Sequence, residues 1–231
     1  MGFEYLTNVP LAQARKEYLE RLVSGGFGSK TETIPVFESC GRVTAKAVYA
    51  HICAPHYAAS AMDGVAVSAK ETFGATETTP VTLKPDQFLV LDTGDPIPED
   101  KDAVIMVEDI VKNGDGSITI HAAAAPWQHI RQIGEDVCAG EMILPSHMTV
   151  SPAAIGAMIA GGVLEIEVIR KPVVGIIPTG DEIIPPCTDP KPGDILEFNG
   201  SIFSAMVRSW GAEAVVYPIV PDKFDQIKEM V

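Results

Sequence analysis

Basic residues, cysteines and long apolar runs are all scarce in this 231-residue chain. Only 17 Lys and Arg accompany 31 Asp and Glu, so the formal net charge of −14 opposes non-specific binding to nucleic acid or to an anionic membrane. The most apolar window, residues 153–164, contains glycines and is far shorter than the roughly 20 residues that span a bilayer. The N-terminus has no basic region followed by an apolar signal core. We therefore expect a cytoplasmic protein that has neither nucleic acid nor a membrane as a partner.

The cysteines number four: Cys40, Cys53, Cys138 and Cys187. They are too few and too scattered for a disulfide framework, and no Cys-x-x-Cys pair occurs, so we expect them to be reduced. His51, Cys53 and His56 place soft ligands close together, which leaves zinc as an alternative there, but no second cluster supplies the usual fourth ligand. The glycine-rich phosphate loops G-x-x-x-x-G-K-[ST] and G-x-G-x-x-G are also absent, which argues against a generic magnesium-dependent nucleotide hydrolase.

The first half of the chain changes from a helical to a strand-like pattern. Apolar residues at helical spacing predict a helix that Thr7 or Asn8 caps and that the Gly25-Gly26 pair ends. From about residue 31 to residue 120, short β-type runs broken by Gly, Pro and Asp predict a compact, β-barrel-like region. The predicted strands are 34–37, 43–49, 65–67, 81–83, 88–91, 103–107 and 118–120.

The second half mixes helices with strands. Ser151 as cap and Pro152 as first residue predict a short helix that ends at residues 161–162, before a strand at 163–169. The elements predicted after Lys171-Pro172 are a buried strand at 173–177, a helix that Asn199 caps and that runs to about Trp210, a strand at 215–220 and a helix from Lys223 onward. Strands joined by such helices pair in parallel, and two of them cannot bury a doubly wound core, so we expect a piece of a longer protein.

The predicted fold class is multi-domain α+β: an elongated β-rich region with a β-barrel-like domain, followed by a truncated α/β domain with a parallel sheet. The predicted boundaries are 1–26 for the N-terminal helix, 27–50 with 138–170 for a linking α+β domain, 51–137 for the β-barrel-like domain and 171–231 for the partial α/β domain.

Three loops combine glycine with acidic residues: SAMDG at 60–64, DTGD at 92–95 and PTGDE at 178–182. A single Asp-Gly is typical of a hairpin turn, but SAMDG is expected to present Asp63 on a turn that Gly64 relieves. Ligands of open parallel sheets bind beyond the carboxyl ends of the strands, which favours the PTGDE loop as a site.

In that loop, Thr179 and Gly180 can donate hydrogen bonds to a phosphate, and Asp181 and Glu182 can hold magnesium or order a water. The alternative is a helix-capping loop with solvated acids. Asp222 follows the next predicted strand and should open on the same end of the sheet, with a helix N-cap as its alternative role.

Five segments occur in a fixed order: SAMDG at 60–64, DTGDPIPEDKDAVIMVED at 92–109, IRQIGED at 130–136, PTGDE at 178–182 and PGDILEFN at 192–199. Together they resemble the molybdopterin molybdenumtransferases, the family of MoeA and the gephyrin E domain, nearly from end to end. The resemblance implies that molybdate is inserted into adenylylated molybdopterin with release of AMP, and that Mg²⁺ is the cofactor. A non-catalytic molybdopterin-binding or dimer scaffold is the alternative.

The resemblance also implies partners and site residues. The partners are a molybdopterin adenylyltransferase as upstream donor and a second copy of the chain, whose α/β domain faces the strand-rich domain of the first. The implied catalytic residues are Asp63, Asp136, Glu182 and Asp222, and Asp63 and Glu182 are also candidate ligands for Mg²⁺ or molybdate. The implied substrate-binding residues are Thr93, Gly94, Arg131, Thr179, Gly180 and Asp181.

Arg131 is the cation beside Asp136, and its planar guanidinium could hold an oxyanion. The alternative is an ion pair of Arg131 with Glu135 or Asp136.

Overall fold

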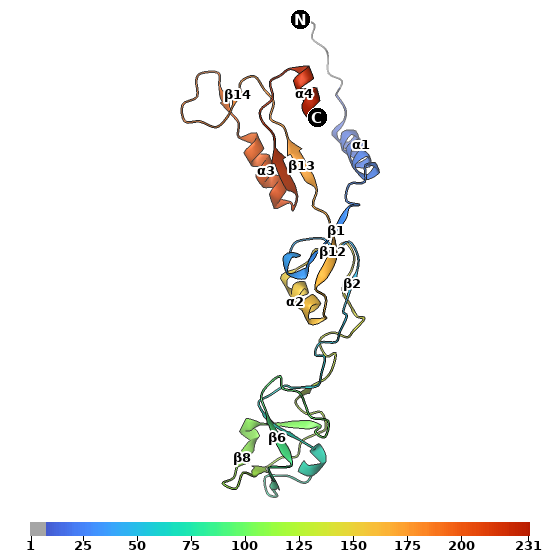
Figure 1. The fold of residues 1–231 in the computed structure, drawn as a ribbon, viewed down its shortest axis with the longest axis vertical. Helices are drawn as coiled ribbons and strands as arrows, with labels where there is room; N and C mark the ends of the chain where they lie inside the picture. The colour runs from blue at the N-terminus through green and yellow to red at the C-terminus, as the bar shows by residue number, and fades with distance from the viewer. Residues whose placement is uncertain (1–7) are drawn as a thin grey trace. The chain divides into compact units, whose positions relative to one another are not determined.

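The computed structural model describes residues 8–231, and its contacts divide the chain into two compact units (Figure 1). The strand-rich unit consists of Ala47–Pro145 and Pro152–Leu164. The α/β unit consists of the described part of Met1–Lys46, Ser146–Ser151 and Glu165–Val231. The finer division into four parts stays a prediction.

Eleven named helices and strands belong to the strand-rich unit: β2 (Val48–Tyr49), β3 (Ala59–Ser60), β4 (Gly64–Val67), β5 (Val81–Leu83), β6 (Phe88–Leu91), β7 (Ala103–Met106), β8 (Ile110–Lys112), β9 (Ile118–Ile120), β10 (Ile130–Arg131), β11 (Met142–Leu144) and α2 (Pro152–Ala160). Strands β6, β4 and β7 form one antiparallel sheet with β4 in the centre, and β5, β9 and β8 form a second with β9 in the centre.

The core of this unit is shared by the two three-stranded sheets. Val65 and Val67 of β4 and Ile105 of β7 are buried together with Leu83 of β5 and Ile118 of β9. Within residues 8–231 the strands of this region form separate short sheets and no closed hydrogen-bonded barrel. The β-barrel-like expectation is therefore wrong in that respect, because short strands broken by Gly and Pro leave edges that do not join.

Helix α2 has the boundaries that the sequence predicts. It starts at Pro152, and Gly161-Gly162 follows its last residue, Ala160. Gly162 has a φ of +76°, which glycine adopts at low cost at the end of a helix. Next to α2, β11 pairs with β2 across an irregular register, so only residues 48–49 of the predicted strand 43–49 form a regular strand.

The α/β unit contains α1 (Leu11–Ser24), β1 (Thr31–Pro35), β12 (Glu165–Ile169), β13 (Val173–Ile176), β14 (Ile183–Ile184), β15 (Ile195–Leu196), α3 (Asn199–Ser209), β16 (Glu213–Val216) and α4 (Phe224–Met230). Strand β1 pairs with β12 in antiparallel register from Thr31↔Ile169 to Pro35↔Glu165. Strands β13 and β16 pair in parallel, as do β14 and β15. The predicted parallel pairing of the strands that flank α3 is therefore present.

Two predicted helix caps are wrong. Helix α1 begins after Pro10 without a side-chain cap, so Asn8 does not cap it, and Thr7 lies outside the described residues. Asn199 is the first residue of α3, and the cap bond comes from Glu197, whose Oε1 accepts the Gly200 N–H at 2.6 Å. A carboxylate near the first turn also suits the positive end of the helix dipole.

Among residues 8–231, none of the helices is both long enough and apolar enough to cross a bilayer.

Candidate functional site

The SAMDG and DTGD loops meet because their strands are neighbours. Strand β4 pairs with β6 from Gly64↔Leu91 onward, which places the residue before Gly64 beside the residues after Leu91. Asp63 Oδ1 there accepts two hydrogen bonds from Thr93, one from the backbone N–H and one from Oγ1, each 2.7 Å long. Both residues are exposed, so this pair faces solvent and is open to a ligand.

Thr93 changes the acidity of Asp63. The hydroxyl hydrogen bond, followed by the backbone one, lowers the pKa of Asp63 below the ordinary value, because both bonds stabilise the charged carboxylate. The carboxylate is therefore ionised and oriented over the whole physiological pH range.

Further hydrogen bonds join the two loops around this pair. Ser60 N–H donates to the Asp95 carbonyl, Gly94 N–H donates to the Ser60 carbonyl, and both bonds are 2.9 Å long. Tyr57 Oη donates to the carbonyl of Gly94 at 2.9 Å. Gly94 has a φ of +92°, a conformation that disfavours other residues. Gly94 is thus needed for the backbone of this loop, and its role as an anion contact stays a prediction.

Gly64 differs from the expectation for a turn. It is the first residue of β4 and does not have a positive φ. A Cβ at this position would lie 2.0 Å from the carbonyl oxygen of Ile105 in the neighbouring strand β7. The glycine therefore permits close approach of two strands, which then present Asp63 at their edge.

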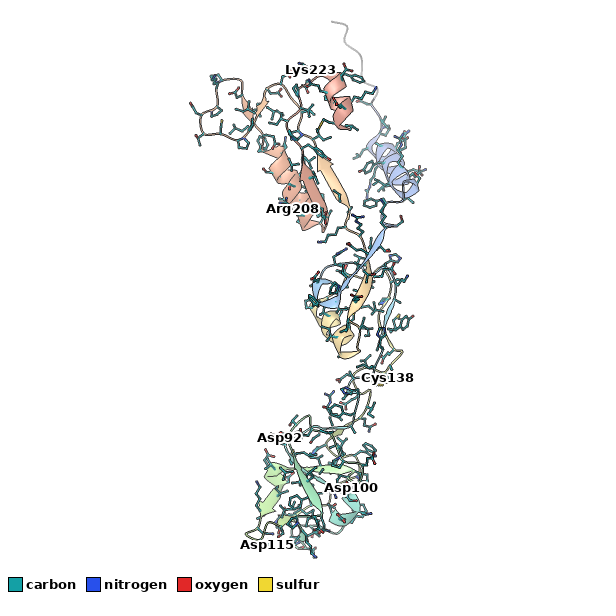
Figure 2. All side chains as sticks on the ribbon, in the orientation of Figure 1. Asp92, Asp100, Asp115, Cys138, Arg208 and Lys223 are labelled. Atoms are coloured by element: carbon teal, nitrogen blue, oxygen red, sulfur yellow. The ribbon has the colours of Figure 1, made fainter. Side chains whose placement is uncertain are left out.

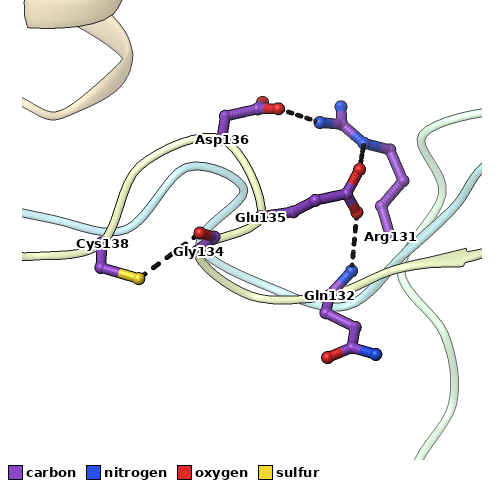
Figure 3. A network of polar contacts seen from close by, with 6 residues as sticks. All are labelled: Arg131, Gln132, Gly134, Glu135, Asp136 and Cys138. Carbon is purple, nitrogen blue, oxygen red and sulfur yellow. Dashed lines mark hydrogen bonds and ion pairs between the residues drawn. The ribbon is translucent and has the colours of Figure 1, made fainter.

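A third loop joins this group through β10, which pairs with β3. Arg131 Nη2 lies 2.5 Å from Asp136 Oδ1, and Arg131 Nε lies 3.5 Å from Glu135 Oε1 (Figure 3). The side-chain hydrogen bond with Asp136, followed by the negative charge of Asp136, raises the pKa of Arg131 above its usual value. The ion-pair alternative is confirmed, with both acids as partners. Arg131 and Asp136 are both partly exposed, so contact with an oxyanion stays a prediction.

The backbone holds the loop that carries Asp136. Gly134 N–H donates to the Pro55 carbonyl at 3.0 Å, and Asp136 N–H donates to the Ala54 carbonyl at 2.9 Å. The position of Asp136 is therefore set by the segment before β3, which also leads to Asp63.

The second group of candidates belongs to the α/β unit. Thr179 forms a parallel bridge with Val220, and Gly180 N–H donates to the Val220 carbonyl at 3.1 Å. Asp222 N–H donates to Asp181 Oδ1 at 3.3 Å, which confirms that Asp222 and the PTGDE loop share one end of the parallel pair. The N-cap of α4 is Lys223, without a side-chain cap bond, so Asp222 is not the cap.

A pocket of about 570 Å³ adjoins this loop. Gly180, Asp181 and Glu197 line it together with Tyr217 and several prolines. Its size suits a small organic ligand, and its acids face a lining that is otherwise largely apolar. Glu182 follows Asp181 at the exposed end of the loop.

The structure brings the candidates together as two groups: Asp63, Thr93, Gly94, Arg131 and Asp136 in the strand-rich unit, and Thr179, Gly180, Asp181, Glu182 and Asp222 in the α/β unit. Within the described residues no three His, Cys, Asp or Glu side chains are grouped to hold a metal ion. His51, Cys53 and His56 are accordingly not grouped as metal ligands in this structure. For Mg²⁺, the donors of either group alone do not make a site, and magnesium at enzyme sites usually takes one or two carboxylates together with substrate phosphates.

No sequence pattern points to His129, which contacts the SAMDG loop of the first group. Its carbonyl accepts the Ala61 N–H at 2.9 Å, and its φ is +55°. Its buried Nδ1 has no hydrogen-bond partner among the described residues. The positive φ of His129 and its hydrogen bond with Ala61 show that it adjoins the SAMDG loop. Neither feature can be seen in the sequence.

The comparison with protein families decides the classification. The family model of the MoeA N-terminal region (domain I and II) matches residues 9–162. The chain belongs to the MoeA family. The matched residues include α1 and β1 of the α/β unit and the whole strand-rich unit except Val163 and Leu164.

Relatives extend the likeness beyond residue 162. This chain is 35% identical over 210 residues to molybdopterin molybdenumtransferase 2 of Mycobacterium tuberculosis, covering 84% of this chain and 52% of that protein. It is 31% identical over 224 residues to the molybdopterin molybdenumtransferase of Haemophilus influenzae, covering 92% and 54%. The chain thus spans about half the length of these relatives.

Solved structures share the fold. A molybdopterin biosynthesis MoeA protein from Pyrococcus horikoshii superposes with a TM-score of 0.77 at 32% identity, covering 87% of this chain and 57% of that one. A second structure of the Pyrococcus protein gives a TM-score of 0.79 at 29% identity and covers 97% and 60%. The fold of this chain is therefore MoeA-like, with mostly small antiparallel sheets and, in the described residues, four α-helices.

Proposed function

We propose that this chain acts in molybdenum cofactor biosynthesis as part of a molybdopterin molybdenumtransferase. The names of the relatives supply the activity, and the observation that carries it to this chain is the Asp63–Thr93 pair. That pair joins the two loops that the resemblance assigns to the family's site. The reaction is the insertion of molybdate into adenylylated molybdopterin, in which the adenylyl phosphoanhydride is cleaved and AMP leaves.

The two groups have separate tasks in this proposal. In the strand-rich unit, Asp63 is a fixed, ionised carboxylate that orients the molybdate side of the reaction, and Arg131 offers its remaining N–H groups to an oxyanion. In the α/β unit, the pocket beside Gly180 and Asp181 holds the pterin or adenylyl part, which its largely apolar lining suits. The pair β13–β16 is accordingly a part of a molybdopterin-binding-type domain. We route no step through Mg²⁺, whose ligand set at enzyme sites usually includes substrate phosphates.

We further propose a homodimer, with a molybdopterin adenylyltransferase as the upstream donor. The support is that the candidates fall into two units of one chain, together with the subunit arrangement that the family resemblance implies. A scaffold without turnover is the alternative, and activity of the complete protein separates the two.

The test is Asp63→Asn in the complete protein, with molybdate at saturation. We expect molybdenum insertion to fall about a hundredfold or more, the scale of losing an oriented charge at a reacting group. Asp115→Asn is the matched control, since Asp115 Oδ1 also accepts two bonds from one residue, from Ser117 N–H at 3.0 Å and from Ser117 Oγ at 2.6 Å. Figure 2 shows Asp115 and Asp92, the neighbour of Thr93, at opposite ends of the part of the chain that contains β6 and β8. Equal activity of the two variants would remove Asp63 from the site.

A further inference from the structure

Cys53 and Cys138 lie opposite each other on the two segments that lead into and out of residues 54–137. Ala54 and Val137 form an antiparallel bridge and exchange both backbone hydrogen bonds, at 2.9 and 3.2 Å. Cys53 and Cys138 are the residues next to this isolated bridge, and in a regular antiparallel ladder such a pair has Cα atoms about 4.5 Å apart. That spacing lies within the range of about 4.4–6.8 Å that a disulfide requires.

The two sulfur atoms border the same space beside Gly134. A Cβ at Gly134 would lie 2.8 Å from Cys138 Sγ and 3.6 Å from Cys53 Sγ. Cys138 Sγ donates to the Gly134 carbonyl at 3.4 Å (Figure 3). Ala139 N–H donates to Cys53 Sγ at 3.4 Å, so the Cys53 sulfur reaches across to the opposite segment. Both sulfur atoms therefore lie within 4 Å of one point beside Gly134.

Both thiols are open to a reagent. Cys138 is exposed and Cys53 is partly exposed, and both belong to the strand-rich unit. Figure 2 shows Cys138 on the segment that connects the part of the chain with β6 and β8 to the part with α2. The other two cysteines, Cys40 and Cys187, belong to the α/β unit.

We propose that Cys53 and Cys138 are a thiol–disulfide modification site whose co-reactant is a low-molecular-weight disulfide. The thiolate of Cys138 attacks one sulfur of the small disulfide, which leaves a mixed disulfide and releases one small thiol. The thiolate of Cys53 then attacks the Cys138 sulfur, which forms the Cys53–Cys138 bond and releases the second small thiol. The two protons and two electrons that the protein thiols lose appear in the two released small thiols.

The bond has a consequence for the candidate site. It closes a covalent ring that contains Asp63, Thr93, Arg131 and Asp136. It also removes the hydrogen bond that Cys138 Sγ donates to the carbonyl of Gly134, which belongs to the same loop as Asp136. This consequence does not depend on the reaction that the site performs.

The test equilibrates the chain with mixtures of oxidised and reduced glutathione, followed by alkylation and mass spectrometry. In a Cys40→Ser/Cys187→Ser background, we expect the two remaining thiols to be lost together, with a peptide that links Cys53 to Cys138. Adding Cys53→Ser should instead trap glutathione on Cys138. The concentration of reduced glutathione that opens the disulfide should be at least about tenfold higher for the folded chain than for the same chain in concentrated urea. The reason is that folding raises the effective concentration of one thiol near the other.

Separate glutathione adducts on both cysteines of the folded chain would overturn the proposal. So would a disulfide that is reduced as easily in the folded chain as in urea, or one that joins Cys40 or Cys187. If the serine variants fail to fold, peptide mapping of the unchanged chain answers the same question.

Discussion

Asp63 is held in place although it is exposed, and Thr93 alone supplies both hydrogen bonds that do so. An exposed carboxylate normally samples several rotamers. Two donors from one residue fix Oδ1 of this carboxylate. The charge is thereby oriented before a substrate arrives, which is the condition for electrostatic stabilisation of a transition state.

Replacing Thr93 with Val should raise the pKa of Asp63 toward the ordinary value. The substitution keeps the backbone donor and the side-chain volume but removes the hydroxyl, the largest cause of the lowered pKa. A lowered folded pKa contributes stability that is present above the unfolded value of about 3.9 and is lost as the pH falls through the folded pKa. The variant should therefore be less stable than the parent near neutral pH and should match it in strong acid. NMR titration of the Asp63 carboxyl carbon and urea unfolding across this range measure both effects.

The control places Thr93→Val in an Asp63→Asn background, where residue 63 does not titrate. There the substitution should have the same effect at every pH. A pH-dependent difference that persists in this background would show that the hydroxyl acts through some other group.

At the residue scale, the sequence motifs identified the acidic residues of the candidate site but not the residues around them. SAMDG and DTGD identified Asp63 and Thr93, and the acids beside Arg131 indicated its ion pair. Tyr57 and His129 were not predicted. Tyr57 donates a hydrogen bond to the Gly94 carbonyl, and the His129 carbonyl accepts one from Ala61 N–H. Both bonds depend on how distant segments of the chain pair.

Strand β4 shows the same limit at the scale of an element. Its four residues are all buried, and it is the central strand between β6 and β7. The sequence placed Gly64 in a turn, where Asp-Gly is common. In the fold its missing side chain lets the Ile105 carbonyl approach, so the glycine serves the sheet.

Gly64→Ala should therefore destabilise the strand-rich unit by about 2–4 kcal/mol, because the new Cβ meets backbone that cannot move without breaking the β4–β7 ladder. Gly114→Ala is the matched control, since Gly114 is exposed, lacks a positive φ and has no atom within 4 Å of its Cβ position. Its effect should stay within about 0.5 kcal/mol. Urea unfolding of the two variants makes the comparison, and equal stabilities would show that β7 yields to the methyl group.

Elements with a clear pattern were predictable, and those of two residues were not. The predicted strands 81–83, 88–91 and 118–120 match β5, β6 and β9 residue for residue. Strands β3 and β10 were missed because two residues carry no periodicity, and their pairing depends on a partner about 70 residues away. They are also the strands that bring the Arg131 loop to Asp63.

At the scale of the whole molecule, the parallel pair β13–β16 is less well covered than the sheet around β4. Val65 and Val67 of β4 are 1% and 0% exposed, whereas Val173 of β13 and Val216 of β16 are 58% and 45% exposed. Each Å² of apolar surface left uncovered forgoes about 25 cal/mol of stabilisation. The parallel pair should therefore open more easily than the sheet around β4.

Limited proteolysis of this chain should give its first cuts beyond about residue 171, while residues 54–137 survive as a fragment at least about tenfold longer. The strand-rich region is the internal control within the same digest. Equal survival of residues 172–231 in a verified monomer would show that the exposed β13–β16 face does not weaken that part of the chain.

The two candidate groups lie in different units, and the proposed homodimer lets each active site take one group from each subunit. Mixing complete Asp63→Asn protein with complete Glu182→Gln protein tests this arrangement. A mixed dimer then has one site with both substitutions and one with neither. If subunits exchange at random, half of the dimers are mixed and half of their sites are intact, so activity should return to about a quarter of the unsubstituted protein.

The control is each variant taken through the same exchange procedure alone, which should stay inactive. Exchange must be verified by mass, with differently tagged subunits. Activity that stays at the level of the single variants after verified exchange would place both groups of a site in one subunit.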